Sequence, residues 1–426
     1  MSESTYFTLS IIIFVAVYAL IIWDKFDRAV VALSGAMLMV LLRVLNQDEA
    51  FAAIDYNTIG LLVAMMIIVM IMRRTGIFEY LAIKMVKISK ANPVNLLIVL
   101  CITTGVLSAL LDNVTTILLI LPVTISVTDE LKLNPIPYII AAIFASNTGG
   151  TATLIGDPPN IMIGSQTGLN FVDFLINDAV IAFPILIITT LLYAYIFRKS
   201  LVTEDVLKQK VMAMDERESI KDALLLKKCL VVFSLVILGF LFHGALHFES
   251  STIALTGAVI LLFVSGIDSE LVLIEVEWKT IFFFSGLFIL VGGIEETGVI
   301  SMLAKGVIEV TGGDLFLTAL AILWVSAIAS AFIDNIPFVA TMIPLILQMG
   351  EMTHMNILPL WWALSLGACL GGNGTAIGAS ANVVAIGIAE REGYRITFGH
   401  YFKIAFPMML LSLTIATVYV LIAYLI

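Results

Sequence analysis

The chain has 426 residues, of which 61% are hydrophobic and only 13% are charged, and its formal net charge is −10. This composition excludes an ordinary soluble globular protein, because such a protein carries far more polar residues. The apolar residues form blocks of about 17 or more, which is long enough to cross a hydrocarbon core, and they lack the short alternation of barrel strands. We therefore predict an all-α polytopic membrane protein.

The apolar blocks that we expect to span the membrane recur along the whole chain. In order they lie near 7–23, 28–44, 57–74, 136–166 and 179–197, and then near 229–246, 251–266, 279–295, 357–387 and 401–425. The first block has no basic leader and no cleavage site, so we expect a retained helix and not a signal peptide. Segments 93–127 and 314–349 are also apolar, but an Asp-Asn pair interrupts each one. Each is either a re-entrant hairpin or two full spans.

The second half of the chain repeats the first at a constant offset, the one that takes Asp112 to Asp334. The Asp-Asn pairs at 112–113 and 334–335 match, as do Asn160 and Asn382, while Gly150-Thr151 faces Gly374-Thr375 after a two-residue slip. A constant offset through polar landmarks indicates a tandem duplication. Each half crosses the membrane an odd number of times, so the halves form an inverted repeat, the usual build of secondary transporters.

This repeat divides the chain into three predicted regions. The first repeat covers 1–197 and contains the interrupted segment 93–127 and the broken helix 136–166. A cytoplasmic linker follows at 198–228, and the second repeat covers 229–426 with the interrupted segment 314–349 and the broken helix 357–387. With the N-terminus outside, only Arg43 and Lys305 among the basic residues fall outside, in agreement with the positive-inside rule. We expect a multi-pass protein of the cell membrane, inner or plasma.

Each half has two polar breaks within apolar sequence. Backbone that leaves a helix inside a bilayer needs protein partners, and half-helix ends can hold ions or polar solutes. We therefore expect the breaks to bind the transported solute or ion. The candidate residues are Asp112, Asn113, Thr115, Thr116, Asn147, Thr148, Gly149, Gly150, Thr151, Asp157, Asn160, Asp334, Asn335, Gly372, Asn373, Gly374, Thr375, Ser380 and Asn382.

Asp112 and Asp334 are the candidate proton-coupling residues. A carboxylate at the bilayer centre costs about 2.5–3.5 kcal/mol on insertion scales, so such residues tend to be functional. Each one either caps a half-helix or binds a proton or cation. Asp157, before Pro158-Pro159, either makes an ordinary turn or is a third coupling carboxylate.

Other functional classes have little support in the sequence. Cys101, Cys229 and Cys369 are isolated, which argues against a metal cluster, and no nucleophile–base pair marks an enzyme. The phosphate-binding loop motif is absent, so this chain alone does not drive transport with ATP, although a soluble ATPase subunit is a conceivable partner. We expect no cofactor besides H⁺ or Na⁺ as coupling ion, no nucleic-acid partner, and a small inorganic solute or ion and the lipid bilayer as partners.

The motifs resemble the ion transporter superfamily, and most closely the arsenite permease, NhaD-type sodium/proton antiporter and P-protein family. The resemblance lies in the two Asp-Asn tips, each with a Pro ten residues after the Asp, and in GGTATLIGDPPN and GNGTAIGASANV. It implies a scaffold domain and an elevator-type transport domain, with opposed re-entrant hairpins at 93–127 and 314–349. It also implies a homodimer, ten spans, and a site between the hairpin tips and the breaks at 148–160 and 371–382.

The leading functional hypothesis is a proton-coupled elevator antiporter that exports arsenite or antimonite through hydroxyl and amide contacts. A Na⁺/H⁺ antiporter that uses Asp112 and Asp334 is the close alternative. Sodium-coupled transport of an organic anion and a channel are further alternatives. Collapse of a pH gradient by one solute in proteoliposomes distinguishes the first three.

Overall fold

The computed structural model describes residues 3–23, 25–212, 215–246 and 248–425. Within these ranges the regular structure is entirely helical, and ten helices are long and apolar enough to cross a membrane. The predicted all-α polytopic class is confirmed. Four of those ten helices belong to the interrupted segments 93–127 and 314–349, whereas both broken helices are too short to be among them.

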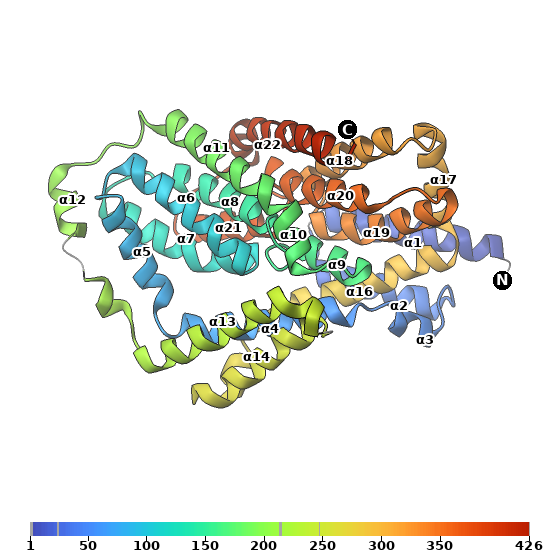
Figure 1. Ribbon diagram of the computed structural model, residues 1–426, viewed down its shortest axis with the longest axis horizontal. Helices are drawn as coiled ribbons and strands as arrows, with labels where there is room; N and C mark the ends of the chain where they lie inside the picture. Colours follow the sequence, from blue (N-terminus) through green and yellow to red (C-terminus); the bar gives the residue numbers. More distant parts are fainter. Residues whose placement is uncertain (1–2, 24, 213–214, 247, 426) are drawn as a thin grey trace.

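The interrupted segments form two helical hairpins. The first consists of α6 (Pro93–Leu110) and α7 (Asn113–Glu130), and the second of α18 (Leu315–Phe332) and α19 (Asn335–Thr353). Each chain reversal takes only two residues, 111–112 and 333–334, and its aspartate caps the second helix. Figure 1 shows the hairpins approaching the middle of the molecule from opposite ends. The buried position of both tips favours re-entrant hairpins over two full spans.

Broken helices accompany the hairpins. The first is α8 (Ile136–Gly150) followed by α9 (Pro158–Thr167), and the second is α20 (Leu358–Gly371) followed by α21 (Ser380–Arg391). A short 3₁₀ turn, Gly372–Gly374, follows α20. The long helices α11 (Ala179–Phe197) and α22 (Phe398–Val420), the latter ending in a π turn at Leu421–Leu425, pack beside α8 and α20. We call the hairpin helices α6, α7, α18 and α19, together with α8, α9, α11, α20, α21 and α22, the hairpin group.

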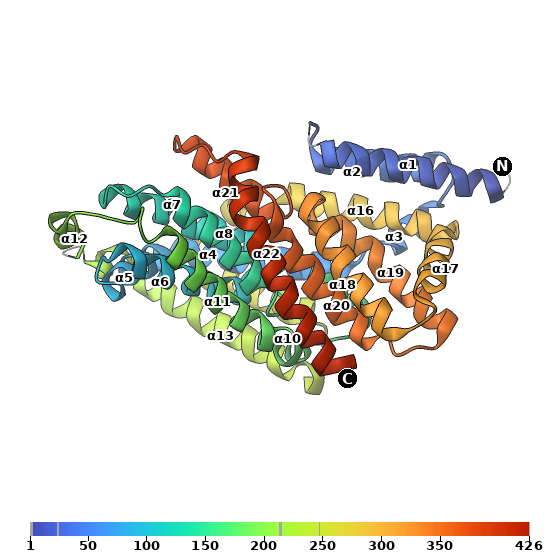
Figure 2. The ribbon, with the colours of Figure 1, turned by 90° about the horizontal axis from the view of Figure 1, so that it is seen from above.

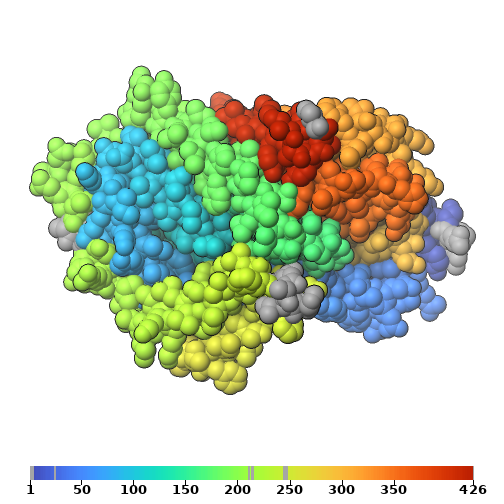
Figure 3. Space-filling model, viewed as in Figure 1, coloured from blue at the N-terminus to red at the C-terminus, as the bar shows by residue number. Residues whose placement is uncertain are grey.

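The remaining long helices form a second group, which we call the flanking group. It contains α1 (Glu3–Trp23), α2 (Arg28–Leu41), α4 (Tyr56–Arg73), α13 (Ala223–Leu246), α14 (Ser250–Ser265) and α16 (Trp278–Glu296). Helices α1, α2 and α16 pack together (Figure 2), as do α4, α13 and α14 (Figure 1). Figure 3 shows α13 and α14 on the outer face, where residues such as Leu235, Val259 and Phe263 are exposed. An apolar outer face is expected for helices that contact lipid.

Short helices connect the longer ones. They are α3 (Gln47–Ala52), α5 (Ile77–Ile88), α10 (Phe171–Asn177), α12 (Asp205–Met212), a 3₁₀ turn (Glu216–Ser219), α15 (Ser269–Leu273) and α17 (Val299–Thr311). Helices α5 and α12 lie at one end of the molecule, and the N-terminal start of α1 lies with α17 at the other end (Figure 1). The predicted linker 198–228 is partly helical, and its residues 213–214 lie outside the described ranges.

Helix α13 begins at Ala223, six residues before the predicted span at 229. The span was predicted to start at 229 because Lys227 and Lys228 are charged, but the helix continues through both residues. A lysine can instead keep its stem along an apolar helix and its ammonium in a polar place. Lys228 does so, because its Nζ donates a 2.6 Å hydrogen bond to the carbonyl of Val264 at the end of α14.

Glycines let the hairpins and broken helices approach closely. A Cβ atom at Gly149 of α8 would lie 2.1 Å from the carbonyl oxygen of Gly105 of α6. A Cβ atom at Gly371 of α20 would lie 2.4 Å from the carbonyl oxygen of Ala327 of α18. The repeat offset relates the first pair of positions to the second, so the two halves use the same contact. Small residues at helix contacts are the common way to pack helices tightly within a membrane.

We predict that Gly149→Ala lowers the stability of the folded protein by at least about 1–3 kcal/mol, because backbone atoms block the added methyl group. Gly371→Ala should behave alike. Gly387→Ala is the matched control, since it lies in α21 with no atom within 4 Å of an added Cβ. Thermal unfolding of the purified proteins in detergent measures the difference. Equal unfolding temperatures for Gly149→Ala and Gly387→Ala would contradict the close packing described above.

Candidate functional site

The site begins at the hairpin tips, where each Asp-Asn pair starts a helix. The Asp112 carboxylate accepts hydrogen bonds from the Thr115 backbone N–H, at 2.8 Å, and from the Thr115 hydroxyl. The Asp334 carboxylate accepts from the Ile336 N–H at 3.2 Å. Both aspartates are buried, with 8% and 4% of their surfaces exposed. Both therefore cap a helix, and capping leaves other carboxylate lone pairs free to bind further groups.

Two asparagines hold the broken helices in shape. The Asn160 side-chain amide donates to the carbonyls of Thr151 and Thr153 at 3.1 and 3.0 Å. The Asn382 side-chain amide donates to those of Gly372 and Thr375 at 2.7 and 2.8 Å. Each asparagine thus reaches back across its own break to carbonyls that the helix no longer satisfies. This arrangement meets the requirement that backbone at membrane depth find partners within the protein.

The structure corrects the predicted alignment of the two breaks. The Thr153 hydroxyl donates to the carbonyl of Ala109 at 2.6 Å, and the Thr375 hydroxyl donates to that of Ala331. Thr153 and Thr375 are related by the same offset as the hairpin aspartates, so the repeat stays in register and needs no two-residue slip. The slip was wrong because the Gly-Thr letter pairs match by chance, while the contact with the hairpin decides which threonines are equivalent.

Amide side chains join the two halves at the centre. Asn147 donates to the side-chain oxygens of Asn373, at 3.1 Å, and Asn382, at 2.8 Å, and it accepts from Asn113 at 3.1 Å. Asn373 donates in turn to the Thr148 hydroxyl at 3.3 Å. All five side chains are buried. Because these groups satisfy one another, they form a structural network in this conformation and offer few free donors or acceptors to a solute.

The remaining predicted residues fall into three kinds. The Thr151 hydroxyl donates to the carbonyl of Asn147 within its own helix. The Thr116 hydroxyl is buried with no hydrogen-bond partner among the described residues. The predicted glycines allow close packing. A Cβ added to Gly150 would contact Gly156, one added to Gly372 would contact Gly378, and one added to Gly374 would contact Ala331.

Asp157 links the first break to the second hairpin. Its two carboxylate oxygens accept from the Asn335 amide at 3.2 and 3.3 Å, and only 1% of Asp157 is exposed. It makes no capping bond to α9, and it interacts electrostatically with both Asp334 and Asp112. Asp157 is therefore more than a turn residue, and three aspartates from different elements gather at one place.

An arginine that the sequence analysis missed reaches this cluster. Arg28, the first residue of α2, forms a 3.0 Å ion pair with Asp334, and Ser380 donates to the same carboxylate oxygen at 2.6 Å. The preceding residue helps to place it, because Asp27 caps α2 through Ala29 and Val30. Asp27 also pairs with Lys279 at 2.8 Å, and this hydrogen bond is the main cause that lowers the pKa of the Asp27 carboxyl group.

A cavity of about 260 Å³ lies between the two helix groups. The hairpin group supplies Asp112 and Ser380, and the flanking group supplies Arg28, Glu277 and Thr280; the other lining residues are Leu62, Met66, Val114, Pro158, Ile336, Val383 and Val384. Glu277 accepts a 3.2 Å hydrogen bond from the Thr280 hydroxyl. Charged groups thus face a mainly apolar cavity from both sides, which is the usual character of a small-solute site.

The sequence analysis also missed Glu277, although a signal was present. Glu277 is the repeat equivalent of Asp55, and both are followed three residues later by a threonine that donates to the carboxylate. Applying the same repeat offset to Asp55 would have found Glu277. Arg28 has no such signal, because its position at the start of a span is typical of an ordinary interfacial residue.

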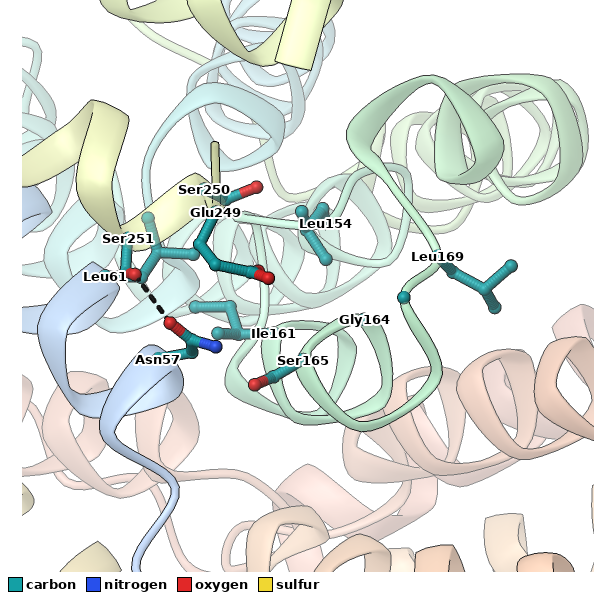
Figure 4. A pocket seen from close by; sticks show the side chains of 11 residues that line it. Asn57, Leu61, Leu154, Ile161, Gly164, Ser165, Leu169, Glu249, Ser250 and Ser251 are labelled. Carbon is teal, nitrogen blue, oxygen red and sulfur yellow. Dashed lines mark hydrogen bonds between the residues drawn. The ribbon is translucent and has the colours of Figure 1, made fainter. Parts of the chain in front are cut away.

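A smaller pocket lies between α4, α9 and the start of α14. Figure 4 shows Asn57, Ser165, Glu249 and Ser251 around it, with Ser251 donating to Asn57 at 2.8 Å. Its volume of about 30 Å³ suits roughly one water molecule. No predicted site residue lines it, so the larger cavity at Asp112 is the candidate site.

Comparisons with known proteins agree with this architecture. The chain is 42% identical over 426 residues to a 46 kDa membrane protein of Mycobacterium leprae (strain TN), covering 98% of this chain and 99% of that protein. It is 44% identical over 423 residues to an uncharacterized transporter of Mycobacterium tuberculosis (strain ATCC 25618 / H37Rv), covering 97% and 98%. The human P protein is 34% identical over 507 residues, covering 99% of this chain but 60% of the P protein.

A solved structure shares the fold. The crystal structure of the Alcanivorax borkumensis YdaH transporter, described as having an unusual topology, matches with a TM-score of 0.56 at 14% identity and covers 96% of this chain and 98% of that one. The model of the citrate transporter family CitMHS matches residues 18–367. The chain is therefore a membrane transporter that belongs to the CitMHS family of the ion transporter superfamily, with the P protein among its homologues.

Proposed function

We propose that this protein is a secondary active transporter in which Asp112 binds the coupling cation, H⁺ or Na⁺. One observation carries the proposal: Asp112 faces the cavity between the helix groups, and it makes no ion pair with any residue that the structure describes. Its repeat equivalent Asp334 is already paired with Arg28. Of the two hairpin aspartates, Asp112 is thus the one whose charge a bound cation or proton would neutralise.

The charges around the cavity favour a cation over an anion. Asp112, Asp157, Asp334 and Glu277 gather there, and Arg28 is the basic residue that lines the cavity. Of the earlier hypotheses, Na⁺/H⁺ exchange therefore has the best support. The arsenite or antimonite hypothesis relied on free amide and hydroxyl groups, and most of these are engaged with one another. Metalloid export stays a prediction without support from this site.

Carboxylate transport is a second candidate, because of the position of Arg28. The guanidinium lines the cavity, and a bidentate arginine contact is the usual way to recognise a carboxylate. The family model carries the description citrate transporter. An anionic substrate would compete with Asp334 for Arg28, and a cation at Asp112 would offset its charge.

The geometry is suited to alternating access by movement of the hairpin group against the flanking group. The cavity and the Arg28–Asp334 pair both lie where the two groups meet, so sliding at this boundary would carry Asp112 from one side to the other. We place α5 and α12 in the cytoplasm, because lysines are concentrated at the end of the molecule where these two helices lie. The N-terminus is then outside. The elevator motion, the homodimer, the ATPase partner and the cell membrane location stay predictions.

The decisive experiment reconstitutes the purified protein in liposomes with an imposed pH gradient. Na⁺, Li⁺, arsenite, antimonite and citrate are added in turn, and a pH-sensitive dye reports collapse of the gradient. We expect Na⁺ or Li⁺ to collapse it with a saturable rate. Collapse by arsenite or citrate alone would replace the cation-exchange proposal, and flux without saturation or pH coupling would indicate a channel.

We predict that Asp112→Asn reduces this coupled flux at least about tenfold, because a neutral amide neither exchanges a proton nor supplies a full charge to Na⁺. Asp129→Asn is the matched control, since it removes a carboxylate from the far end of the same helix, where Asp129 contacts Tyr394. The initial rate of gradient collapse is the measurement. Full coupled flux in Asp112→Asn would remove the basis of the proposal.

We predict that Arg28→Gln destabilises the protein by about 3–5 kcal/mol, because Asp334, with a side chain only 2% exposed, is left buried without its cation. The double variant Arg28→Gln with Asp334→Asn should regain most of the loss. Thermal unfolding in detergent measures both.

Arg28→Lys tests the second candidate function in the citrate arm of the liposome assay. It should lower the rate of citrate transport only if Arg28 binds the carboxylate, since lysine keeps the charge but not the planar guanidinium group.

A further inference from the structure

Asp178 is a buried carboxyl group outside the predicted site. It lies between α10 and α11, has no exposed surface, and makes no side-chain bond to the N-terminus of α11. The sequence analysis passed over it because a single aspartate before an apolar span is typical of a solvated span end. The tertiary structure instead buries it against Ser365 of α20.

Ser365 connects Asp178 to the broken helix of the first half. Its hydroxyl oxygen lies 2.7 Å from Asn160 Oδ1 and 2.5 Å from Asp178 Oδ2. The orientation of Asn160 is determined, because only its NH₂ group can donate to the carbonyls of Thr151 and Thr153. Asn160 Oδ1 is therefore an acceptor, and the short contact with Ser365 requires the serine hydrogen.

The number of hydrogens limits which groups can donate at the two contacts of Ser365. A serine hydroxyl has one hydrogen, and the bond to Asn160 uses it. While the serine hydrogen points to Asn160, the 2.5 Å contact between Ser365 and Asp178 has a hydrogen only if Asp178 carries one and donates it. An ionised Asp178 would instead take the serine hydrogen, and the Cys369 thiol at 3.5 Å would be the remaining partner of Asn160 Oδ1 among the described residues.

The surroundings of Asp178 also disfavour its charged form. Its Oδ1 atom has no hydrogen-bond partner among the described residues, and no ion pair involves Asp178 there. The titratable groups that interact with it are Cys369 of α20 and the phenols Tyr419 and Tyr424, none of which supplies a positive charge. A carboxylate that is fully buried and half unpartnered is expensive, whereas a protonated carboxyl group satisfies both contacts of Ser365.

We propose that Asp178 is protonated in this conformation and donates a hydrogen bond to Ser365, so that it is a proton-holding group separate from Asp112, the proposed site of the coupling cation. Loss of that proton turns the serine hydroxyl from Asn160 to Asp178. Asn160 then loses the partner that supports its hold on Thr151 and Thr153. Asp178 is thus a positioning residue that ties the α8–α9 break to its own protonation, and within the proposed function this makes the transport rate sensitive to pH.

Infrared spectroscopy of the full-length purified protein tests this inference without a transport assay. At neutral pH, the spectrum of wild type minus Asp178→Asn should contain the carbonyl stretching band of a protonated carboxyl group. Asp173→Asn is the matched control, because Asp173 of α10 accepts a 2.7 Å hydrogen bond from the Asn170 backbone N–H. This substitution should remove only the band of an ionised carboxylate. Loss of an ionised band in Asp178→Asn would overturn the proposal.

Ser365→Ala provides a second, independent readout if Asp178→Asn fails to fold. Removing the hydroxyl should move the protonated carboxyl band to higher frequency, because Asp178 loses its acceptor, and an unmoved band would show that Asp178 does not donate to Ser365. Asp112→Asn should keep the Asp178 band whatever its transport rate. The failure of Asp112 as the coupling residue and the failure of Asp178 as a proton holder are therefore separate results.

Discussion

The whole structure depends on one requirement, that polar groups at membrane depth find partners inside the protein. Two helices stop in the middle of the molecule, and their open carbonyls are taken up by Asn160 and Asn382, which reach back across the breaks. Lipid cannot supply these bonds, and each unsatisfied group would cost several kcal/mol. The breaks exist only because hairpin tips, serines and amides from both halves surround them.

The two halves of the repeat both meet this requirement, but with different side chains. Asn113 bonds Asn147 in the first half, whereas its equivalent Asn335 bonds Asp157. Asn147 donates to Asn382, and its equivalent Cys369 donates to Asn160. The two halves share a backbone arrangement, but different side chains at equivalent positions give the halves different roles. One hairpin aspartate is neutralised by an arginine, and the other faces the cavity.

The boundary between the hairpin and flanking groups combines strong and weak contacts. It is crossed by the ion pair between half-buried Arg28 and buried Asp334, and it also holds the cavity with Asp112. Within the hairpin group, by contrast, backbones touch through glycines and leave no room for adjustment. A rigid unit against a boundary held by a few polar contacts is a physical basis for movement between discrete positions.

The amino-acid sequence by itself determined the helical membrane class, the duplication and the four polar breaks, because hydropathy and letter patterns follow directly from the lipid environment. It also pointed to Asp112, Asp157 and Asp334. The tertiary structure alone decided that Arg28 neutralises Asp334, that Glu277 faces Asp112, and that Asp178 is buried. These contacts join residues far apart in the chain, and no local pattern reports which distant side chain will lie opposite a carboxylate once the helices pack.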